Sequence, residues 1–162
     1  MIHNINSYFS AEKQESIIFM TVGLVAIALS IWIWMNDHRL KSMAYPLVVI
    51  GLMQLVVGST VYLRTDLQVS TLTTQLQENS ESFQRDEISR MQTVMRNFSI
   101  YKVIEMLLLI TGLAMVAFLQ RNDIAAGIGM GFVLQAAITL TLDIFAETRG
   151  SDYLIALQGM QG

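Results

Sequence analysis

Apolar residues concentrate in four runs along the chain, each bounded by polar residues. The runs cover about residues 17–35, 46–63, 100–119 and 124–146. Each has roughly twenty residues, and a helix of that length spans the hydrocarbon core of a bilayer, which is about 30 Å thick. The pattern therefore predicts an all-α fold, an integral membrane four-helix bundle.

The segment between the second and third runs is polar overall, yet it keeps a helical period. Ile88, Met91, Met95 and Phe98 recur at spacings of three, four and three residues, as on one face of a helix. Cap-forming residues cluster at Asn79 and Ser80, where this period lapses. We therefore expect the second and third spans to continue beyond the bilayer as an extramembrane helical hairpin over residues 64–98.

Four segments follow from this pattern. Residues 1–63 hold the N-terminal segment and the first two spans, 64–98 the hairpin, 99–149 the third and fourth spans, and 150–162 a C-terminal tail. Ser10 is a candidate N-cap of the first helix, which is expected to end at Asn36 and Asp37. Asn122 and Asp123 are expected to cap the fourth span after a short turn, so the third and fourth spans should be antiparallel neighbours.

Small and polar residues recur every fourth position in the fourth span. This polar ridge consists of Gly127, Gly131, Gln135, Thr139, Asp143 and Glu147. Such a row gains nothing from contact with acyl chains, so it should face protein or water. The GxxxG spacing of its two glycines predicts close helix packing, because a nucleotide-binding loop would need a preceding strand.

The first two spans also have faces on which small residues recur. Gly23 and Ser30 are seven residues apart in the first span, as are Gly51 and Gly58 in the second. Small residues at this spacing predict helix–helix contacts in a membrane.

Two glutamines fall near the middle of their spans. Gln54 and Gln135 should therefore lie at the same depth, with Thr111 of the third span nearby. A primary amide in hydrocarbon needs a partner, and an interhelical hydrogen bond contributes about 0.6–2 kcal/mol. We favour a packing role for these side chains over contact with a substrate or ion.

Two carboxylates lie about one turn inside the membrane on the hairpin side. For Glu105, an ion pair with Lys102 on the same helical face is the favoured interpretation. For Asp143, two interpretations stay open: an interfacial ion pair with Arg64 or Arg149, or binding of a proton or cation.

Composition narrows the chemistry. The 162 residues are 53% hydrophobic and 14% charged, with a net charge of -3 and no cysteine, and the mean hydropathy is +0.49. The absence of cysteine excludes thiolate catalysis and disulfides. The only histidines, His3 and His38, lie outside the spans, so no cofactor or metal is expected, and Asp37 beside His38 is interpreted as an exposed turn. Scattered basic residues predict no nucleic-acid binding.

Orientation is argued from the basic residues. Seven of the ten lie on the side of the termini and the hairpin, and three, Arg39, Lys41 and Arg121, lie in the two turns. This excess favours termini and hairpin in the cytoplasm of a bacterial inner membrane. The density of charge at Arg39 and Lys41, in one short turn, argues for the opposite orientation.

Two functions from different classes fit these observations. The first is a non-catalytic bundle that acts through helix–helix assembly with itself or a partner, as a small membrane subunit, a sensor or an immunity or defence component. A homo-oligomer is expected from the GxxxG pair and the buried glutamines. A protein partner would dock on Ile88, Met91, Met95 and Phe98, unless the hairpin arms bury these residues against each other.

The second function is conduction, by an oligomer whose Gln54, Gln135, Thr139 and Asp143 line a path for protons or cations. The two functions differ at one face of the fourth span. Direct contact of these side chains with neighbouring helices favours assembly, whereas a hydrated cavity favours conduction. An intramembrane enzyme is the least favoured hypothesis, because the sequence does not pair a nucleophile with a base.

Overall fold

A computed structural model describes residues 1–36 and 40–161. In this part of the chain four α-helices follow one another: α1 (Ile2–Asn36), α2 (Ala44–Glu78), α3 (Ser80–Phe118) and α4 (Asp123–Gln158). Two short 3₁₀ turns, η1 (Lys41–Met43) and η2 (Gly159–Gln161), precede α2 and follow α4. These described residues contain no strand, and the all-α bundle is confirmed. The turn proposed at Asp37 and His38, and the charge of Arg39, lie outside the described residues.

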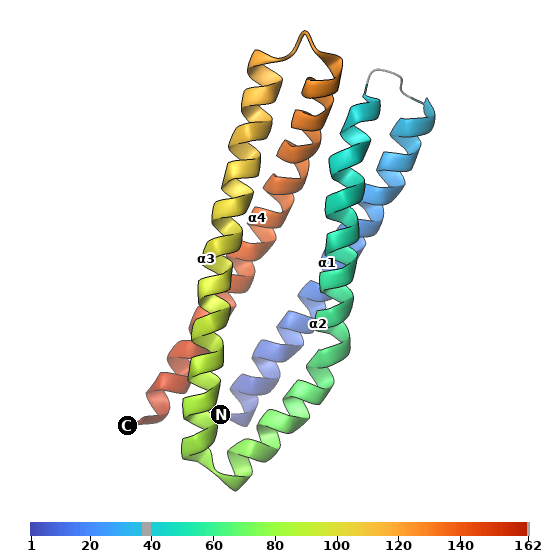
Figure 1. Ribbon diagram of the computed structural model, residues 1–162. Coiled ribbons are helices and arrows are strands. Elements are labelled where there is room, and N and C mark those ends of the chain that lie inside the picture. Colours follow the sequence, from blue (N-terminus) through green and yellow to red (C-terminus); the bar gives the residue numbers. More distant parts are fainter. Residues whose placement is uncertain (37–39, 162) are drawn as a thin grey trace.

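The helices form two antiparallel hairpins, α1 with α2 and α3 with α4 (Figure 1). Each of the four described α-helices is long and apolar enough to cross a membrane, as in a multi-pass membrane protein. The N-terminus, the C-terminus and the α2–α3 turn lie at one end of the molecule (Figure 1). Helix α4 connects the hairpins, because it packs against η1, α2 and α1 as well as against α3.

Asparagines mark two of the helix ends as expected. Asn79 has extended backbone between α2 and α3, and its side chain accepts a hydrogen bond from the Ser82 amide at 3.0 Å. Asn122 likewise accepts from the amides of Ile124 and Ala125 at the start of α4. Both side chains satisfy amides that have no partner within their own helix.

The expected start of the first helix at Ser10 was wrong. Helix α1 begins at Ile2, because Ile5 and Phe9, one turn apart, are completely buried in a core outside the apolar runs. Burial of an apolar face stabilises a helix more than a single cap does. Residues 2–9, which precede Ser10, are therefore part of the bundle, and not a leading loop.

The C-terminal tail predicted for 150–162 was also wrong. Helix α4 continues to Gln158, and its residues Tyr153 and Leu157 are buried against the other helices. The extramembrane part is therefore a bundle of four helix ends, and not a hairpin alone. Its core, which we call the terminal core, consists of Ile5, Phe9, Leu72, Phe83, Met91, Tyr153 and Leu157.

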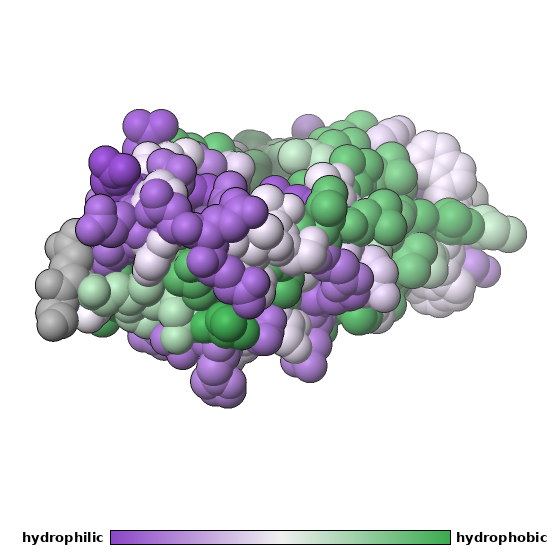
Figure 2. Space-filling model, turned by 90° about the horizontal axis from the view of Figure 1, so that it is seen from below, coloured by the Kyte–Doolittle hydropathy of each residue, from purple (hydrophilic) through white to green (hydrophobic). Residues whose placement is uncertain are grey.

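Surface polarity agrees with this division. Seen from the end with the termini, hydrophilic side chains gather on the near part, while hydrophobic ones cover much of the part behind (Figure 2). Within the described residues, only 6% of the most apolar stretch of α3 is buried, against 28–33% for the other three helices. Helix α3 therefore has the most exposed apolar surface of the bundle.

Candidate functional site

The two glutamines meet inside the bundle. Gln54 donates a hydrogen bond from Nε2 to Oε1 of Gln135 at 3.2 Å, and each residue is 1% exposed. The Oε1 atom of Gln54 and the Nε2 atom of Gln135 are buried and have no partner among the described residues. These two atoms are an acceptor and a donor, so the pair has one unused group of each kind. The expected interhelical hydrogen bond between α2 and α4 is confirmed.

Glycines bring α1 and α2 together as the sequence predicted. A Cβ on Gly23 would lie 2.6 Å from the carbonyl oxygen of Gly51, and one on Gly58 would lie 2.9 Å from a carbonyl oxygen of α1. Ser30 donates a hydrogen bond to the carbonyl oxygen of Ala44 at 3.0 Å. Backbone atoms cannot move aside as flexible side chains do, so this contact has no room for a larger residue.

The GxxxG pair of α4 packs within the chain. A Cβ on Gly127 would collide with the Ser42 hydroxyl, and one on Gly131 would collide with the Pro46 ring and lie 3.0 Å from the carbonyl oxygen of Met43. The hydroxyl of Ser42 also donates to a carbonyl oxygen at the start of α4 at 3.2 Å. Hence the glycines that favoured pairing with a second copy are used to join α4 to η1 and α2.

Glu105 of α3 faces Thr139 and Asp143 of α4. Its Oε2 atom is buried and has no hydrogen-bond partner in the described part of the chain. The expected ion pair with Lys102 was wrong, because Lys102 pairs with Glu147 one turn beyond Asp143. The ammonium reaches across to α4, where the Glu147 carboxylate is nearer the membrane surface. Thr139 donates to the carbonyl oxygen of Gln135 in its own helix at 3.0 Å.

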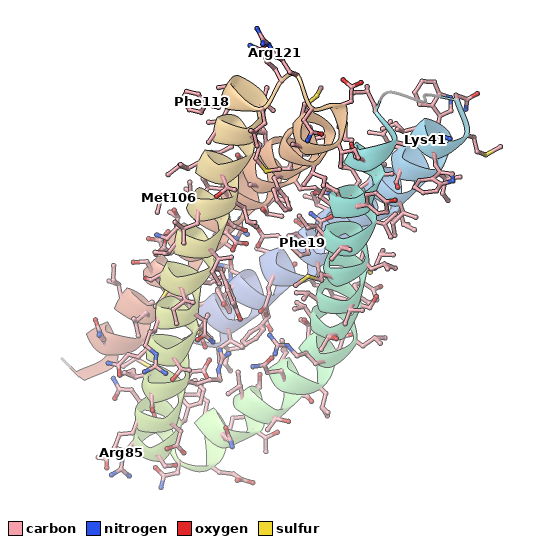
Figure 3. The ribbon with its side chains drawn as sticks, turned by 45° about the horizontal axis from the view of Figure 1, so that its top comes forward. Phe19, Lys41, Arg85, Met106, Phe118 and Arg121 are labelled. Carbon is pink, nitrogen blue, oxygen red and sulfur yellow. The ribbon has the colours of Figure 1, made fainter. Side chains whose placement is uncertain are left out.

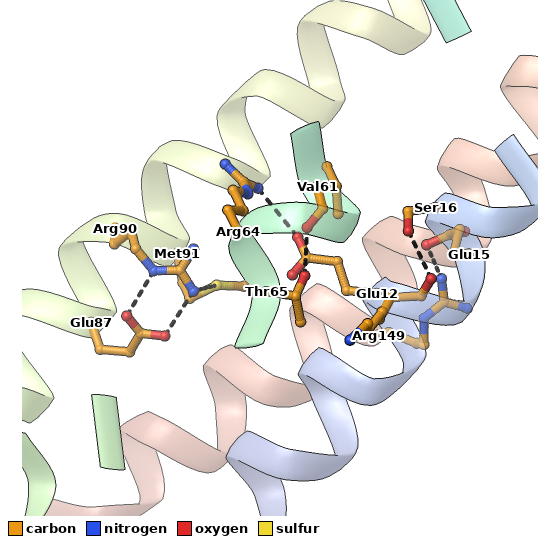
Figure 4. Close-up of polar contacts among 11 residues, drawn as sticks. Glu12, Glu15, Ser16, Val61, Arg64, Thr65, Glu87, Arg90, Met91 and Arg149 are labelled. Carbon is orange, nitrogen blue, oxygen red and sulfur yellow. Dashed lines mark hydrogen bonds and ion pairs between the residues drawn. The ribbon is translucent and has the colours of Figure 1, made fainter. Parts of the chain in front are cut away.

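Asp143 has neither of the arginine partners that the sequence proposed. Arg64 pairs with Glu12 at 3.4 Å, and Arg149 pairs with Glu15 (Figure 4). Both acids belong to α1, in the polar turns before its apolar run, and the sequence did not indicate that they face Arg64 and Arg149. Burial raises the pKa of the Glu12 carboxyl, and the charge of Arg64 lowers it in part.

A buried polar cluster joins three helices in the terminal core. Glu87 accepts two hydrogen bonds from the Arg90 guanidinium at 2.7 Å each and one from the Tyr153 hydroxyl at 3.1 Å (Figure 4 shows the Glu87–Arg90 contacts). Arg90 lies over the ring of Phe9, and Tyr8 stacks on Tyr153 with ring centroids 4.6 Å apart. Burial raises the pKa of both tyrosine hydroxyls, and nearby carboxylates raise them further.

The proposed partner face of the hairpin is covered by the chain itself. Met91 is completely buried, and Ile88 packs against the terminal core. The side chains of Met95, Met91 and Phe98 pack against Gly150 of α4, where they would lie 3.1–3.9 Å from an added Cβ. The terminal segments of α1 and α4, and not only the opposite arm, fill this face.

Thr111 was predicted to lie near the glutamine pair, and this prediction was wrong. It is exposed on the outer side of α3, while its neighbour Gly112 packs against Gly129 of α4. Two neighbouring residues on a helix point in directions about 100° apart, so depth alone does not place a side chain inside the bundle. On the same helix, Met106 and Phe118 point away from the other helices (Figure 3).

Sequence reasoning missed the residues that organise the extramembrane end. Phe9, Glu87, Arg90 and Tyr153 were not identified, although the burial of Phe9 and Tyr153 has a local signal. The pairs Ile5 with Phe9 and Tyr153 with Leu157 each repeat an apolar residue after one helical turn. That spacing was visible outside the four long runs. The buried carboxylate of Glu87 has no such signal.

Comparison with known protein families finds no match to this chain, and no curated protein and no solved structure matches it.

Proposed function

We propose that this protein is a non-catalytic membrane subunit that acts through assembly of its spanning helices with those of a second chain. The proposal is supported by how the intramembrane polar groups are used. The Gln54 and Gln135 amides bond to each other directly, and glycine contacts close the bundle between this pair and the opposite membrane surface. Direct contact of this kind favours assembly over a hydrated path.

The observation that carries the proposal is an unpartnered stripe on α3. This outer stripe consists of Ile104, Leu107, Thr111, Ala114 and Phe118, all of which are exposed. The spacing alternates between three and four residues, which matches the contact positions of paired helices. Small residues at its centre allow the close approach that helix association in a membrane requires.

Thr111 sets this stripe apart from the rest of the lipid-facing surface. The exposed threonines Thr21, Thr60 and Thr141 each donate to a carbonyl oxygen of their own helix, at 2.7–2.8 Å. The Thr111 hydroxyl makes no hydrogen bond within the described residues. Its hydroxyl is therefore free to bond across an interface, where such a bond contributes about 0.6–2 kcal/mol.

Cysteine crosslinking tests the proposal, because the chain has no cysteine of its own. Thr111→Cys in native membranes should give a covalent adduct on mild oxidation or with a short bifunctional reagent. Leu113→Cys, which is exposed on the same helix but lies off the stripe, is the matched control. An adduct of twice the chain mass identifies a second copy, and any other mass identifies a different partner. Equal labelling of both variants, or none, would refute assembly through α3.

Conduction is a second candidate, favoured by one observation. The Glu105 carboxylate has a buried oxygen without a partner in the described chain, beside Thr139 and Asp143. An ionisable group at that depth is commonly part of an ion or proton path. Liposomes with wild-type protein should then pass protons or cations faster than liposomes with Asp143→Asn. Equal leakage at the background rate would end this candidate.

We further propose that the termini and the hairpin lie in the cytoplasm of a bacterial inner membrane. The structure puts the termini and the α2–α3 turn at one end (Figure 1), and seven of the ten basic residues belong to that side. Reporter fusions to the C-terminus test this orientation. Activity of an exported reporter there would reverse it.

A further inference from the structure

An apolar groove of about 330 Å³ lies between the last turns of α1 and the first turns of α2. Its floor is formed by Ser30 and Ala44, whose side chains are small and buried. The Ser30 hydroxyl is satisfied by the Ala44 carbonyl oxygen, so the floor presents no free polar group. Its walls are formed by Ile31, Trp34, Met35, Tyr45, Val48 and Val49.

The groove opens toward the region that lipid occupies. Ile31, Tyr45 and Val49 are each more than half exposed, and they belong to helix segments that are apolar enough to cross a membrane. Trp34 and Tyr45 pack edge to face with ring centroids 5.7 Å apart. Aromatic rings of this kind gather at the level of lipid headgroups. One end of the groove therefore lies in hydrocarbon, and the other lies at the membrane surface.

A cation stands at the surface end of the groove. The Lys41 ammonium lies 5.9 Å from the centre of the Trp34 ring. No carboxylate of the described residues forms an ion pair with it. Figure 3 shows Lys41 and Arg121 at the same end of the molecule, opposite Arg85.

We propose that this groove binds one glycerophospholipid of the surrounding bilayer, with an acyl chain against Ile31, Val48 and Val49 and the phosphate beside the Lys41 ammonium. Hydrocarbon is the substance that surrounds these walls in a membrane, and every such lipid carries a phosphate at the depth of the aromatic pair. A partner helix would instead have to supply an acidic group there to balance Lys41. The proposal is independent of assembly through α3.

The two tryptophans of the chain provide the test. Trp32 and Trp34 are both exposed and lie two residues apart on α1, so they point to different sides of the helix, and only Trp34 lines the groove. Trp32→Phe leaves Trp34 as the sole tryptophan, and Trp34→Phe leaves Trp32. Phosphatidylglycerol with brominated acyl chains quenches tryptophan on contact, and it is titrated into protein in a mild detergent.

Quenching of Trp34 should saturate near an equimolar ratio of lipid to protein. Quenching of Trp32 should only follow the lipid content of the micelle. Equal curves for the two tryptophans would overturn the proposal, because random lipid contact reaches both.

Paired variants in the Trp32→Phe background locate the site. Val48→Phe fills the groove and should abolish the saturable phase, whereas Val57→Phe, exposed elsewhere on α2, should retain it. Lys41→Gln should weaken apparent affinity roughly five-fold, the effect expected of one basic residue beside an anionic lipid, and Arg121→Gln at the other turn should not. Saturable quenching that survives Val48→Phe would overturn the groove as the site, and unchanged affinity in Lys41→Gln would overturn the placement of the phosphate.

Discussion

Gln54 and Gln135 place two primary amides inside the bundle, where each residue is 1% exposed. One hydrogen bond joins the two amides, because they lie at the same depth on facing sides of α2 and α4. A single substitution leaves a buried amide with no partner, which costs more than loss of the hydrogen bond itself. The pair therefore selects one rotation of α4 relative to α2.

Gln54→Leu should lower the free energy of unfolding by about 1–2 kcal/mol, because the Gln135 amide stays buried and unbonded. The double variant Gln54→Leu with Gln135→Leu should recover part of this loss. Reversible unfolding in mixed micelles measures all three proteins as a double-mutant cycle. Strictly additive effects would contradict a direct interaction between the amides.

Gly51 shows how little space separates α1 from α2. Gly51→Ala should destabilise the protein by about 1–3 kcal/mol, because the added Cβ would lie 2.9 Å from the Gly23 carbonyl oxygen. This loss exceeds the gain of about 1 kcal/mol that alanine brings to a helix interior. Gly159→Ala is the control, since nothing lies within 4 Å of its Cβ. Thermal unfolding in detergent compares the two, and equal melting temperatures would argue against a tight contact.

At the scale of the elements, all four described helices continue past the apolar runs at the same end. The ends of α1 and α4 supply Ile5, Phe9, Tyr153 and Leu157 to the terminal core, and the α2–α3 hairpin supplies the rest. Such a core gives the termini a structural role. It also leaves the hairpin without a free apolar face for a partner.

A chain that ends at Gly150 should therefore be markedly less stable, because it loses Tyr153 and Leu157 from the core. Burial of one large apolar side chain contributes about 1.5–3 kcal/mol. Removal of only residues 161 and 162 is the matched control. Limited proteolysis of the α2–α3 turn measures the effect, and a cleavage rate unchanged by the longer truncation would show that the end of α4 is dispensable.

Alkaline pH should weaken the same core. Burial raises the pKa of the Tyr8 hydroxyl above its ordinary value of about 10. Below that pH the phenol is neutral in both states; above it, the unfolded chain ionises while the folded one does not, so stability falls as pH rises. Tyr8→Phe should reduce this fall, as followed by circular dichroism between neutral and alkaline pH. An unchanged profile for Tyr8→Phe would contradict the burial of this hydroxyl.

At the scale of the whole molecule, the bundle consists of two hairpins that are joined by α4. Each hairpin has its own glycine contact, Gly23 with Gly51 and Gly112 with Gly129. One residue, Asn79, separates α2 from α3. The interface between the hairpins is built from the η1–α4 contacts, the glutamine pair and the terminal core.

Two fragments, residues 1–78 and 80–162, should therefore associate when produced together in one membrane, since each can insert as a hairpin before packing. Copurification through a tag on one fragment measures this association. Gly131→Leu should prevent it, because Gly131 lies against Pro46. Ile144→Leu, on the exposed side of α4, should have no effect. Loss of copurification in both variants would point to an insertion defect instead.

Much of the element order could be predicted from local pattern. The predicted features include four runs of about twenty apolar residues, the caps at Asn79 and Asn122, and the helix faces that carry glycine. Each of these features depends only on neighbours within one or two helical turns. Gln54 and Gln135 could be matched because the depth of a residue follows from its position along a span. Thr111 shows the limit of that argument, since depth does not specify the direction in which a side chain points.

The sequence by itself determined that this chain is an all-α protein with four segments apolar enough to cross a membrane and a polar hairpin between the second and third. Hydrophobic burial acts along each run separately, so no tertiary information is needed. Only the tertiary structure decided how far α1 and α4 extend and which acid pairs with each of Lys102, Arg64 and Arg149. It also decided that the helix faces carrying glycine pack against other helices of the same chain. Those choices depend on the rotation of each helix about its axis, and packing against distant segments sets that rotation.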